Sequence, residues 1–371
     1  MTSAIAAWTV FGISLLGADG APAAERKTEN VILFTLDGAR TQEIFGGLDL
    51  GILASVTKKG TPPEKTPAYR KYWASTPEER RRKLMPFFWG ELMAKHGSIA
   101  GNRALGSTVM VANRHRFSYP GYAEILNGNA HDDAIKTNDP IQNPFPTVLE
   151  FAKGELGLRR EQVAVFASWE IIKWIAEHKS GELTCNAGFE PYEHPDPAIA
   201  ELSRFQSQTP PSWDEARFDA YTFRFALAHL ERYKPRLLFI SFDDTDDWAH
   251  RKQYDRTLDA LHRSDAYIRT LWEALERIEE YRGRTTLILT ADHGRGNTPK
   301  DWCDHGEKTE GAQYVWLAVA SPDVALRGEW RDSGTQHLDQ VAATICRFLG
   351  LDPQKFSREA GPPIERLFMD R

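Results

Sequence analysis

The sequence predicts an α/β fold in which a mostly parallel central sheet is covered by helices on both faces. Two observations support this prediction. Short apolar runs recur along the chain, and segments long enough to form helices separate them. The runs are continuous rather than alternating, which is typical of parallel strands that are buried on both faces. Strands that alternate with helices form sheets of this kind.

The clearest strand is expected at residues 30–36, an apolar run that ends in Asp37 and Gly38. Three later runs repeat this pattern of apolar residues followed by polar ones. All the expected strands are at residues 30–36, 107–112, 163–167, 237–242, 285–290 and 314–320. Helices are expected at residues 85–96, 119–126, 254–281 and 338–349. Residues 56–84 are rich in Lys, Arg, Glu and Pro, which predicts an exposed and partly helical excursion.

The overall composition indicates only a broad class of protein. The chain has 371 residues, of which 41% are hydrophobic and 26% are charged, a balance typical of globular proteins. The net charge of -6 argues against a broadly basic surface that binds nucleic acids. No repeat or low-complexity linker divides the chain, so we expect a single domain over residues 24–371. Cys185, Cys303 and Cys346 are too few for a disulfide scaffold or a cysteine-based zinc module, and they allow at most one bridge.

Residues 1–23 are expected to be a signal peptide. Residues 4–16 form an uncharged, mostly apolar run of 13 residues, which is shorter than the ~20 residues that a membrane-spanning helix needs. An Ala-Pro-Ala-Ala segment follows at residues 21–24, and small residues in this pattern are typical of a signal-peptidase cleavage site. The first three residues carry no positive charge, unlike most signal peptides. The mature protein is therefore expected to be periplasmic or secreted, without a transmembrane segment.

Acidic and imidazole side chains follow three of the expected strands, at or shortly after the point where each strand ends. They are Asp37, Asp246, His250, Asp292, His293 and, somewhat later, His305. Because ligands bind at the carboxyl ends of parallel strands in open sheets, we expect these side chains to lie close together. Such donors suit two divalent metal ions, with zinc as the first choice and manganese or magnesium as alternatives. Each residue alone has a more ordinary explanation, such as a helix N-cap, so it is their coincidence that favours a metal site.

Ser118 is the candidate nucleophile. It lies just ahead of Pro120, where a helix is expected to begin. The free backbone N–H groups at a helix N-terminus favour an anionic group, and a nearby metal ion would lower the pKa of the hydroxyl and activate it. The alternative is that Ser118 only caps this helix.

The motifs resemble those of the alkaline phosphatase superfamily, which includes alkaline phosphatases, nucleotide pyrophosphatase/phosphodiesterases, phosphopentomutases and cofactor-independent phosphoglycerate mutases. The resemblance extends over residues 30–351 but is specific only at five motifs. These are Leu36-Asp37-Gly38-Ala39-Arg40, Ser118-Tyr119-Pro120-Gly121-Tyr122, Asp246-Asp247-Trp248-Ala249-His250, Thr290-Ala291-Asp292-His293-Gly294 and Asp304-His305-Gly306. The resemblance implies an alkaline phosphatase-like fold with inserted loops.

The resemblance also implies a division of the site residues between two metal ions. One ion would be held by Asp246, His250 and His305, and the other by Asp37, Asp292, His293 and the Ser118 oxygen. Ser118 would attack phosphorus as an alkoxide and form a phosphoseryl enzyme, which water on the other ion would hydrolyse. Charge stabilisation would supply most of the catalysis. The implied substrate is a small phosphate monoester or diester, and the sequence leaves that choice and the oligomeric state open.

Two assignments within this site stay open. His337 is an alternative to His305 as the last metal ligand, although the distance of His305 from the following apolar strand fits better. Asn138 resembles the residue that binds a non-bridging phosphate oxygen in the phosphodiesterases. Because it precedes an Asp-Pro pair, it fits a simple turn residue equally well.

Departures from the family pattern narrow the expected function. Gly121 and Tyr122 replace the Asn-His pair of the phosphodiesterases, and no cysteine lies in the Cys-x-Pro-x-Arg motif of the common sulfatases. The expected function is an exported two-metal phosphoric-ester hydrolase. The alternatives are a sulfuric-ester or phosphonate hydrolase on the same scaffold, or a non-catalytic protein that binds metal or anions. Trp169, Trp248 and Trp302 lie near the expected catalytic loops, where each would either stack on a substrate group or simply pack.

Overall fold

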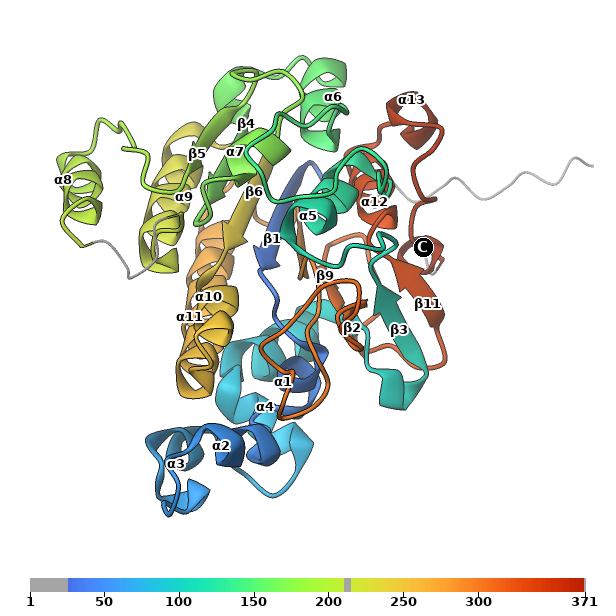
Figure 1. Cartoon of the computed structure of the whole chain (residues 1–371). Helices are drawn as coiled ribbons and strands as arrows, with labels where there is room; N and C mark the ends of the chain where they lie inside the picture. The colour runs from blue at the N-terminus through green and yellow to red at the C-terminus, as the bar shows by residue number, and fades with distance from the viewer. Residues whose placement is uncertain (1–25, 210–214, 370–371) are drawn as a thin grey trace, which may run out of the picture.

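The computed structural model describes residues 26–209 and 215–369. Its largest feature is an eight-stranded sheet with the strand order β10-β2-β9-β7-β1-β6-β4-β5 (Figure 1). The strands are β1 Asn30–Leu36, β2 Gly97–Ala100, β4 Val163–Ala167, β5 Thr184–Ala187, β6 Leu237–Phe242, β7 Thr285–Thr290, β9 Leu317–Ala320 and β10 Gly328–Glu329. Five of the seven neighbouring pairs are parallel, and only β2–β9 and β7–β9 are antiparallel. The mostly parallel sheet is therefore confirmed, whereas the expected signal peptide lies outside the described residues.

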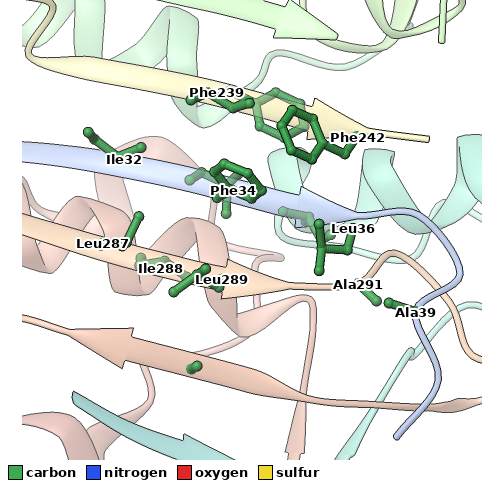
Figure 2. Packing of buried hydrophobic residues seen from close by; sticks show 14 of the residues in the cluster. Ile32, Phe34, Leu36, Ala39, Phe239, Phe242, Leu287, Ile288, Leu289 and Ala291 are labelled. Atoms are coloured by element: carbon green, nitrogen blue, oxygen red, sulfur yellow. The ribbon is translucent and has the colours of Figure 1, made fainter. Parts of the chain in front are cut away.

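The centre of the sheet is β1, which pairs in parallel with β6 on one side and with β7 on the other. All seven residues of β1 are buried. Figure 2 shows this part of the core, with Phe34 of β1 beside Phe242 of β6. Their ring centroids are 4.7 Å apart in an edge-to-face arrangement. The continuous apolar run of β1 thus corresponds to a strand that is covered on both faces.

Two groups of helices cover the sheet (Figure 1). In one group α9 contacts β4 and β6, and α11 packs on α9 and α10. In the other group α12 contacts β1, α5 and α6, and α7 packs on α5. The helices are α1 Thr41–Gly46, α2 Leu50–Val56, α3 Pro67–Tyr72, α4 Pro77–Leu84, α5 Ser118–Asn127, α6 Val148–Glu155, α7 Ile172–Ile175, α8 Pro197–Gln206, α9 Asp219–Tyr233, α10 Asp244–His250, α11 Tyr254–Arg277, α12 Gln340–Leu349 and α13 Pro353–Phe356.

The strand expected at residues 314–320 is divided between two sheets. A small sheet has the order β11-β3-β8, and its strands are β3 Ser107–Met110, β8 Tyr314–Val315 and β11 Gly334–His337. The chain leaves this small sheet at Trp316 and continues as β9 in the large one. The indole Nε1 of Trp316 donates a hydrogen bond to the backbone oxygen of Ala39, at 3.0 Å. A continuous apolar run cannot reveal this change of sheet, because the residues on both sides of it are buried.

Most of the other expected elements are present, with shifted ends. The long helix expected to reach residue 281 ends at Arg277, and the closing helix begins at Gln340. The helix expected at residues 85–96 is a π-helix, Phe88–His96, and α3 and α4 lie in the exposed excursion. Strands β2, β5, β10 and β11 were not expected, because they are short or polar.

The structure also bears on possible disulfide bridges and on membrane-spanning helices. Cys185, Cys303 and Cys346 are all free, so none of the bridges that the sequence allowed is formed between them. Among the residues that the structure describes, no helix combines the length and the apolar character needed to cross a bilayer.

Candidate active site

The carboxyl ends of β1, β6 and β7 lie at one edge of the sheet, and Figure 2 shows the three strands running in the same direction. The register pairs Leu36 of β1 with Phe242 of β6, and Thr35 of β1 with Thr290 of β7. The loops that follow these strands therefore begin side by side. In agreement with this, the backbone N–H of Gly38 donates a hydrogen bond to Asp292 Oδ1 at 3.0 Å. The predicted site residues of these three loops are thus gathered at one place.

Asp37, Asp292 and His293 form the first candidate metal-binding group. All three are buried, and one ligand atom from each lies within 4.8 Å of the others. His293 Nε2 is 3.4 Å from Asp37 Oδ1 and 3.5 Å from Asp292 Oδ2. The other ring nitrogen, Nδ1, donates a hydrogen bond to the backbone oxygen of Gly294 at 2.9 Å, since a carbonyl oxygen can only accept. This bond leaves the lone pair of Nε2 available for a metal ion.

Asp246, His250 and His305 form the second group, and their ligand atoms also lie within 4.8 Å of one another. His250 Nε2 is 3.0 Å from Asp246 Oδ2 and 3.0 Å from His305 Nε2. The two groups adjoin, because the rings of His293 and His305 are stacked with their centroids 4.1 Å apart. His337 lies at the end of β11 and belongs to neither group. The geometry therefore favours His305 over His337 as the last ligand.

The chemistry of these two groups fits divalent cations. Asp37 Oδ1 and Asp292 Oδ2 are buried and have no hydrogen-bond partner among the described residues. Buried charged oxygens without partners are costly, and a bound cation removes that cost. Carboxylate oxygens and imidazole nitrogens are the donors that zinc prefers when cysteine is absent. Each group could therefore hold one ion.

The pKa values in the first group predict how metal binding depends on pH. Burial, followed by the charge of Asp37, raises the pKa of Asp292 to about 8. Burial alone would lower the pKa of His293, but the charges of Asp292 and Asp37 outweigh it and raise that pKa to about 9. A metal ion must displace these protons, so its apparent affinity should increase between about pH 6 and pH 9. Chelator competition across this range measures the affinity, and calorimetry in buffers of different ionisation enthalpy measures the released protons. A pH-independent affinity would contradict the prediction.

Ser118 is the first residue of α5, and its side chain lies beside the first group. It is 6% exposed, and its Oγ is 3.4 Å from His293 Nε2. The N-cap position of α5 is Phe117, and no side chain caps the helix. The alternative role of Ser118 as a simple helix cap is therefore not observed.

Gly121 allows α5 to lie very close to the loop that carries Asp292. A Cβ atom on Gly121 would be 2.3 Å from the backbone oxygen of Asp292, so no larger residue fits at this position. Tyr122 is buried, and its hydroxyl donates a hydrogen bond to Asp37 Oδ2 at 3.0 Å. The two residues that depart from the phosphodiesterase pattern thus have structural roles here. Gly121 sets the distance between the nucleophile helix and the metal-binding loop, and Tyr122 orients Asp37.

Glu124 holds the segment that leads into Ser118. Its carboxylate is completely buried and accepts four hydrogen bonds. The donors are Ala112 N at 2.8 Å, Asn113 N at 2.9 Å, Asn113 Nδ2 at 2.8 Å and Asp339 N at 3.1 Å. Asn113 Oδ1 in turn accepts a hydrogen bond from the backbone N–H of Arg116 at 2.8 Å. Nothing in the local sequence distinguishes Glu124 from a surface glutamate, so sequence reasoning missed this role.

Replacing Glu124 with alanine should destabilise the fold and impair catalysis together. The substitution leaves four N–H groups without their acceptor, and each buried unsatisfied group costs about 1–3 kcal/mol, which water entry reduces. We expect a loss of about 2–4 kcal/mol in the free energy of unfolding, and a lower kcat with a smaller change in KM. Urea unfolding and steady-state kinetics provide the two readouts. Glu124→Gln keeps one acceptor oxygen and should show a smaller loss, and equal effects of the two substitutions would contradict this role.

Ser118 and Asn138 lie in the wall of one cavity of about 380 Å³. Its lining residues are Ser118, Asn138, Trp169, Glu215, Ala216, Asp243, Asp246, Asp247, His250 and His305. Asn138 Oδ1 accepts a hydrogen bond from the backbone N–H of Tyr119 at 2.9 Å. Of the three tryptophans near the loops, Trp169 lines this cavity, whereas Trp302 is buried against Tyr254 with ring centroids 5.1 Å apart.

Several residues of the site were not expected from the sequence. Asp243 and Asp247 line the cavity although they belong to neither candidate metal group. Arg295 is buried, pairs with the carboxylate of Asp246 and donates a hydrogen bond to the backbone oxygen of Cys303. It thereby connects the loop of the second group to the segment that leads to His305. No motif identifies these residues, because their roles depend on contacts between separate loops.

Comparisons with known proteins give one match to a family model and several matches to solved structures. Residues 206–353 match the family model of the metalloenzyme superfamily. That segment contains five of the seven predicted ligands. They are Asp246, His250, Asp292, His293 and His305. No sequence among the curated proteins matches the chain significantly.

Solved structures resemble most of the chain. The alkaline phosphatase PafA has a TM-score of 0.59 at 10% identity, with 93% of this chain and 100% of that chain covered. The lipoteichoic acid synthase LtaP from Listeria monocytogenes has a TM-score of 0.56 at 9% identity, with 90% and 76% covered. The phosphonate monoester hydrolase of Agrobacterium radiobacter has a TM-score of 0.52 at 14% identity, with 91% and 77% covered. The chain therefore has an alkaline phosphatase-like fold, and its residues 206–353 match the model of the metalloenzyme superfamily.

Proposed function

We propose that the chain is a metal-dependent hydrolase of phosphoric esters that acts through Ser118. The observation that carries this proposal is the position of Ser118 Oγ, 3.4 Å from His293 Nε2 and beside two adjoining groups of metal-binding side chains. Two divalent cations, with zinc as the first choice, fit the carboxylate and imidazole donors of these groups. A site that only bound metal would not need a hydroxyl at this position.

The residues of the chain have distinct parts in the proposed reaction. When bound, the cations supply Lewis acidity, which lowers the pKa of the Ser118 hydroxyl and neutralises phosphoryl oxygens. Ser118 Oγ forms a bond to phosphorus while the bond from phosphorus to the ester oxygen breaks, and the alcohol leaves with a proton. Water then hydrolyses the ester on Ser118, which releases phosphate from a monoester substrate or a phosphate monoester from a diester substrate, and restores the hydroxyl. Because Asn138 Oδ1 already accepts the Tyr119 N–H, the Asn138 Nδ2 group remains to bind a non-bridging phosphate oxygen.

The proposal also includes the localisation, the domain range and the substrate of the enzyme. Residues 1–23 have the pattern of a signal peptide, so we propose a periplasmic or secreted protein with one hydrolase domain over residues 24–371. Its partner is a small phosphate ester, and the net charge of -6 supports the exclusion of a nucleic-acid surface.

Removal and return of the metal ions test the proposed function. Chelation should abolish the hydrolysis of p-nitrophenyl phosphate or bis-p-nitrophenyl phosphate, and zinc should restore it. Rates on p-nitrophenyl sulfate and on an aryl phosphonate, measured in parallel, separate the phosphoric-ester reaction from the two alternative ester classes. Faster turnover of the sulfate or the phosphonate would reassign the substrate class. Hydrolysis that is insensitive to chelation, or metal content without any turnover, would refute the proposal.

A further inference from the structure

Four of the residues that line the cavity beside Ser118 are aromatic or acidic and lie outside the two candidate metal groups. We call these four residues together the acidic wall, and they are Trp169, Glu215, Asp243 and Asp247. None of the ten residues that line the cavity is a lysine or an arginine. The acidic wall therefore combines three carboxyl groups and one indole, with no cationic side chain among the lining residues.

The acidic wall is assembled from three separate segments. Trp169 follows β4 and is 8% exposed, and Asp243 follows β6 and is 7% exposed. An isolated β-bridge joins Trp169 to Ala216, and the indole Nε1 donates a hydrogen bond to Glu215 Oε2 at 3.2 Å. The indole and the carboxylate of Glu215 thus hold one another at the cavity. The hydrogen bond and the β-bridge therefore fix the positions of these two side chains relative to each other.

The charge of the acidic wall is not balanced within the wall itself. The side chains of Asp243 and Asp247 hydrogen-bond to each other, so that one carboxyl group neighbours another. Asp247 Oδ2 is buried and has no hydrogen-bond partner among the described residues. A ligand with positive charge would relieve this arrangement, whereas an anionic ligand would make it worse.

We propose that the acidic wall binds an ammonium group in the alcohol part of the substrate, so that the chain hydrolyses phosphate esters of amino alcohols. This inference rests on the proposed phosphoric-ester function and specifies its substrate class. The phosphoryl group lies at Ser118 and the ammonium group lies against the indole of Trp169 and the carboxyl groups beside it. Aromatic faces and carboxylates together are typical of sites for quaternary ammonium ligands. A cavity of about 380 Å³ is large enough for a small ester of this kind.

Two pairs of isosteric esters test the inference. Choline phosphate is compared with 3,3-dimethylbutyl phosphate, in which a carbon atom replaces the charged nitrogen. The p-nitrophenyl diesters of the same two alcohols form the second pair, so that the result does not depend on a preference for monoesters or diesters. We expect kcat/KM to be at least ~10-fold higher for the charged member of whichever pair is hydrolysed. Equal values for the two members of the hydrolysed pair would overturn the inference.

Substitutions in the acidic wall show whether it is the source of this preference. Glu215→Gln removes the charge but keeps an oxygen to accept the Trp169 N–H, and Trp169→Leu removes the aromatic face. Both should move the ratio of the two kcat/KM values toward one. Glu279→Gln is the matched control, since Glu279 is exposed and lies between α11 and β7, before the amino end of β7. It should leave the ratio unchanged. If the ratio of the two kcat/KM values stays unchanged in both variants of the acidic wall, the inference is also overturned.

A binding measurement separates recognition from turnover. In Ser118→Ala, calorimetry should show tighter binding of choline phosphate than of 3,3-dimethylbutyl phosphate. If the two esters are hydrolysed equally well, the acidic wall does not select a cation, yet the proposed function stands. If neither these esters nor the aryl phosphates are hydrolysed, the proposed function fails and the inference fails with it. A third metal ion per chain that is lost in Glu215→Gln would assign the acidic wall to a cation other than substrate.

Discussion

Replacing Ser118 with alanine is expected to lower kcat for ester hydrolysis by roughly 10³-fold or more, because the substitution removes the attacking oxygen. Among the described residues that line the cavity, Ser118 is the one with a hydroxyl group, so none of the others can take over the attack. Steady-state kinetics with an aryl phosphate measure the loss. Acid quenching during turnover should trap a phosphoryl group on the wild-type chain, located by mass spectrometry on the peptide that contains Ser118, and no such adduct on the variant.

Two controls separate the loss of the nucleophile from damage to the site. Ser118→Thr keeps a hydroxyl and should retain part of the activity, whereas Ser118→Ala should not. Metal content per chain should stay within one ion of the wild-type value in both variants, because three protein ligands remain in each group. An alanine variant as active as the wild type would remove Ser118 from the reaction.

Replacing Asp292 with asparagine is expected to remove one metal ion per chain and to lower kcat by roughly 10³-fold. Asp292 is completely buried, and its Oδ2 has no hydrogen-bond partner among the described residues. Asparagine keeps the oxygen that accepts the Gly38 N–H but lacks the negative charge that holds a cation. Elemental analysis of the purified variant measures the metal content. Asp255→Asn is the matched control, because Asp255 is exposed at the start of α11.

In the metal-free chain, Asp292→Asn should increase the stability of the fold at high pH. Burial, followed by the charge of Asp37, raises the pKa of Asp292 from 3.8 to about 8. The stability that this group contributes is therefore fully present below about pH 4 and is lost as the pH rises through about 8. Asparagine does not titrate, so with chelator present Asp292→Asn should unfold at a higher temperature than the wild type near about pH 9. The difference should vanish near about pH 4, and a lower unfolding temperature at high pH would contradict this account.

Much of the sheet could be predicted because its signal is local. The apolar runs of β1, β4, β6 and β7 appear in the structure with the expected bounds, since a strand buried on both faces needs apolar residues at every position. Strand β5 has the sequence Thr-Cys-Asn-Ala and gave no such signal. The run at residues 314–320 carried the signal, but the chain changes sheet within it at Trp316. Apolar character predicts burial, and it does not tell in which sheet a residue is buried.

The positions of the candidate metal-binding residues could be predicted for a related reason. Asp37 directly follows β1, Asp292 comes two residues after the end of β7, and the carboxyl ends of such parallel strands share one edge of the sheet. The sequence did not decide between His305 and His337, because both lie in segments whose spatial path depends on distant contacts. The structure places His305 beside His250, with 3.0 Å between their Nε2 atoms.

By itself, the sequence determined the α/β class, the main strands and the candidate residues for binding metal or attacking an ester. These properties depend on residues that are neighbours in the sequence, so local sequence patterns predict them. Only the tertiary structure decided that Glu124 supports the segment before Ser118 and that Tyr122 orients Asp37. It alone showed that Trp169 and Asp243 line one cavity. The physical reason is that hydrogen bonds and charge interactions act over a few ångströms in space, between residues that are far apart in the chain.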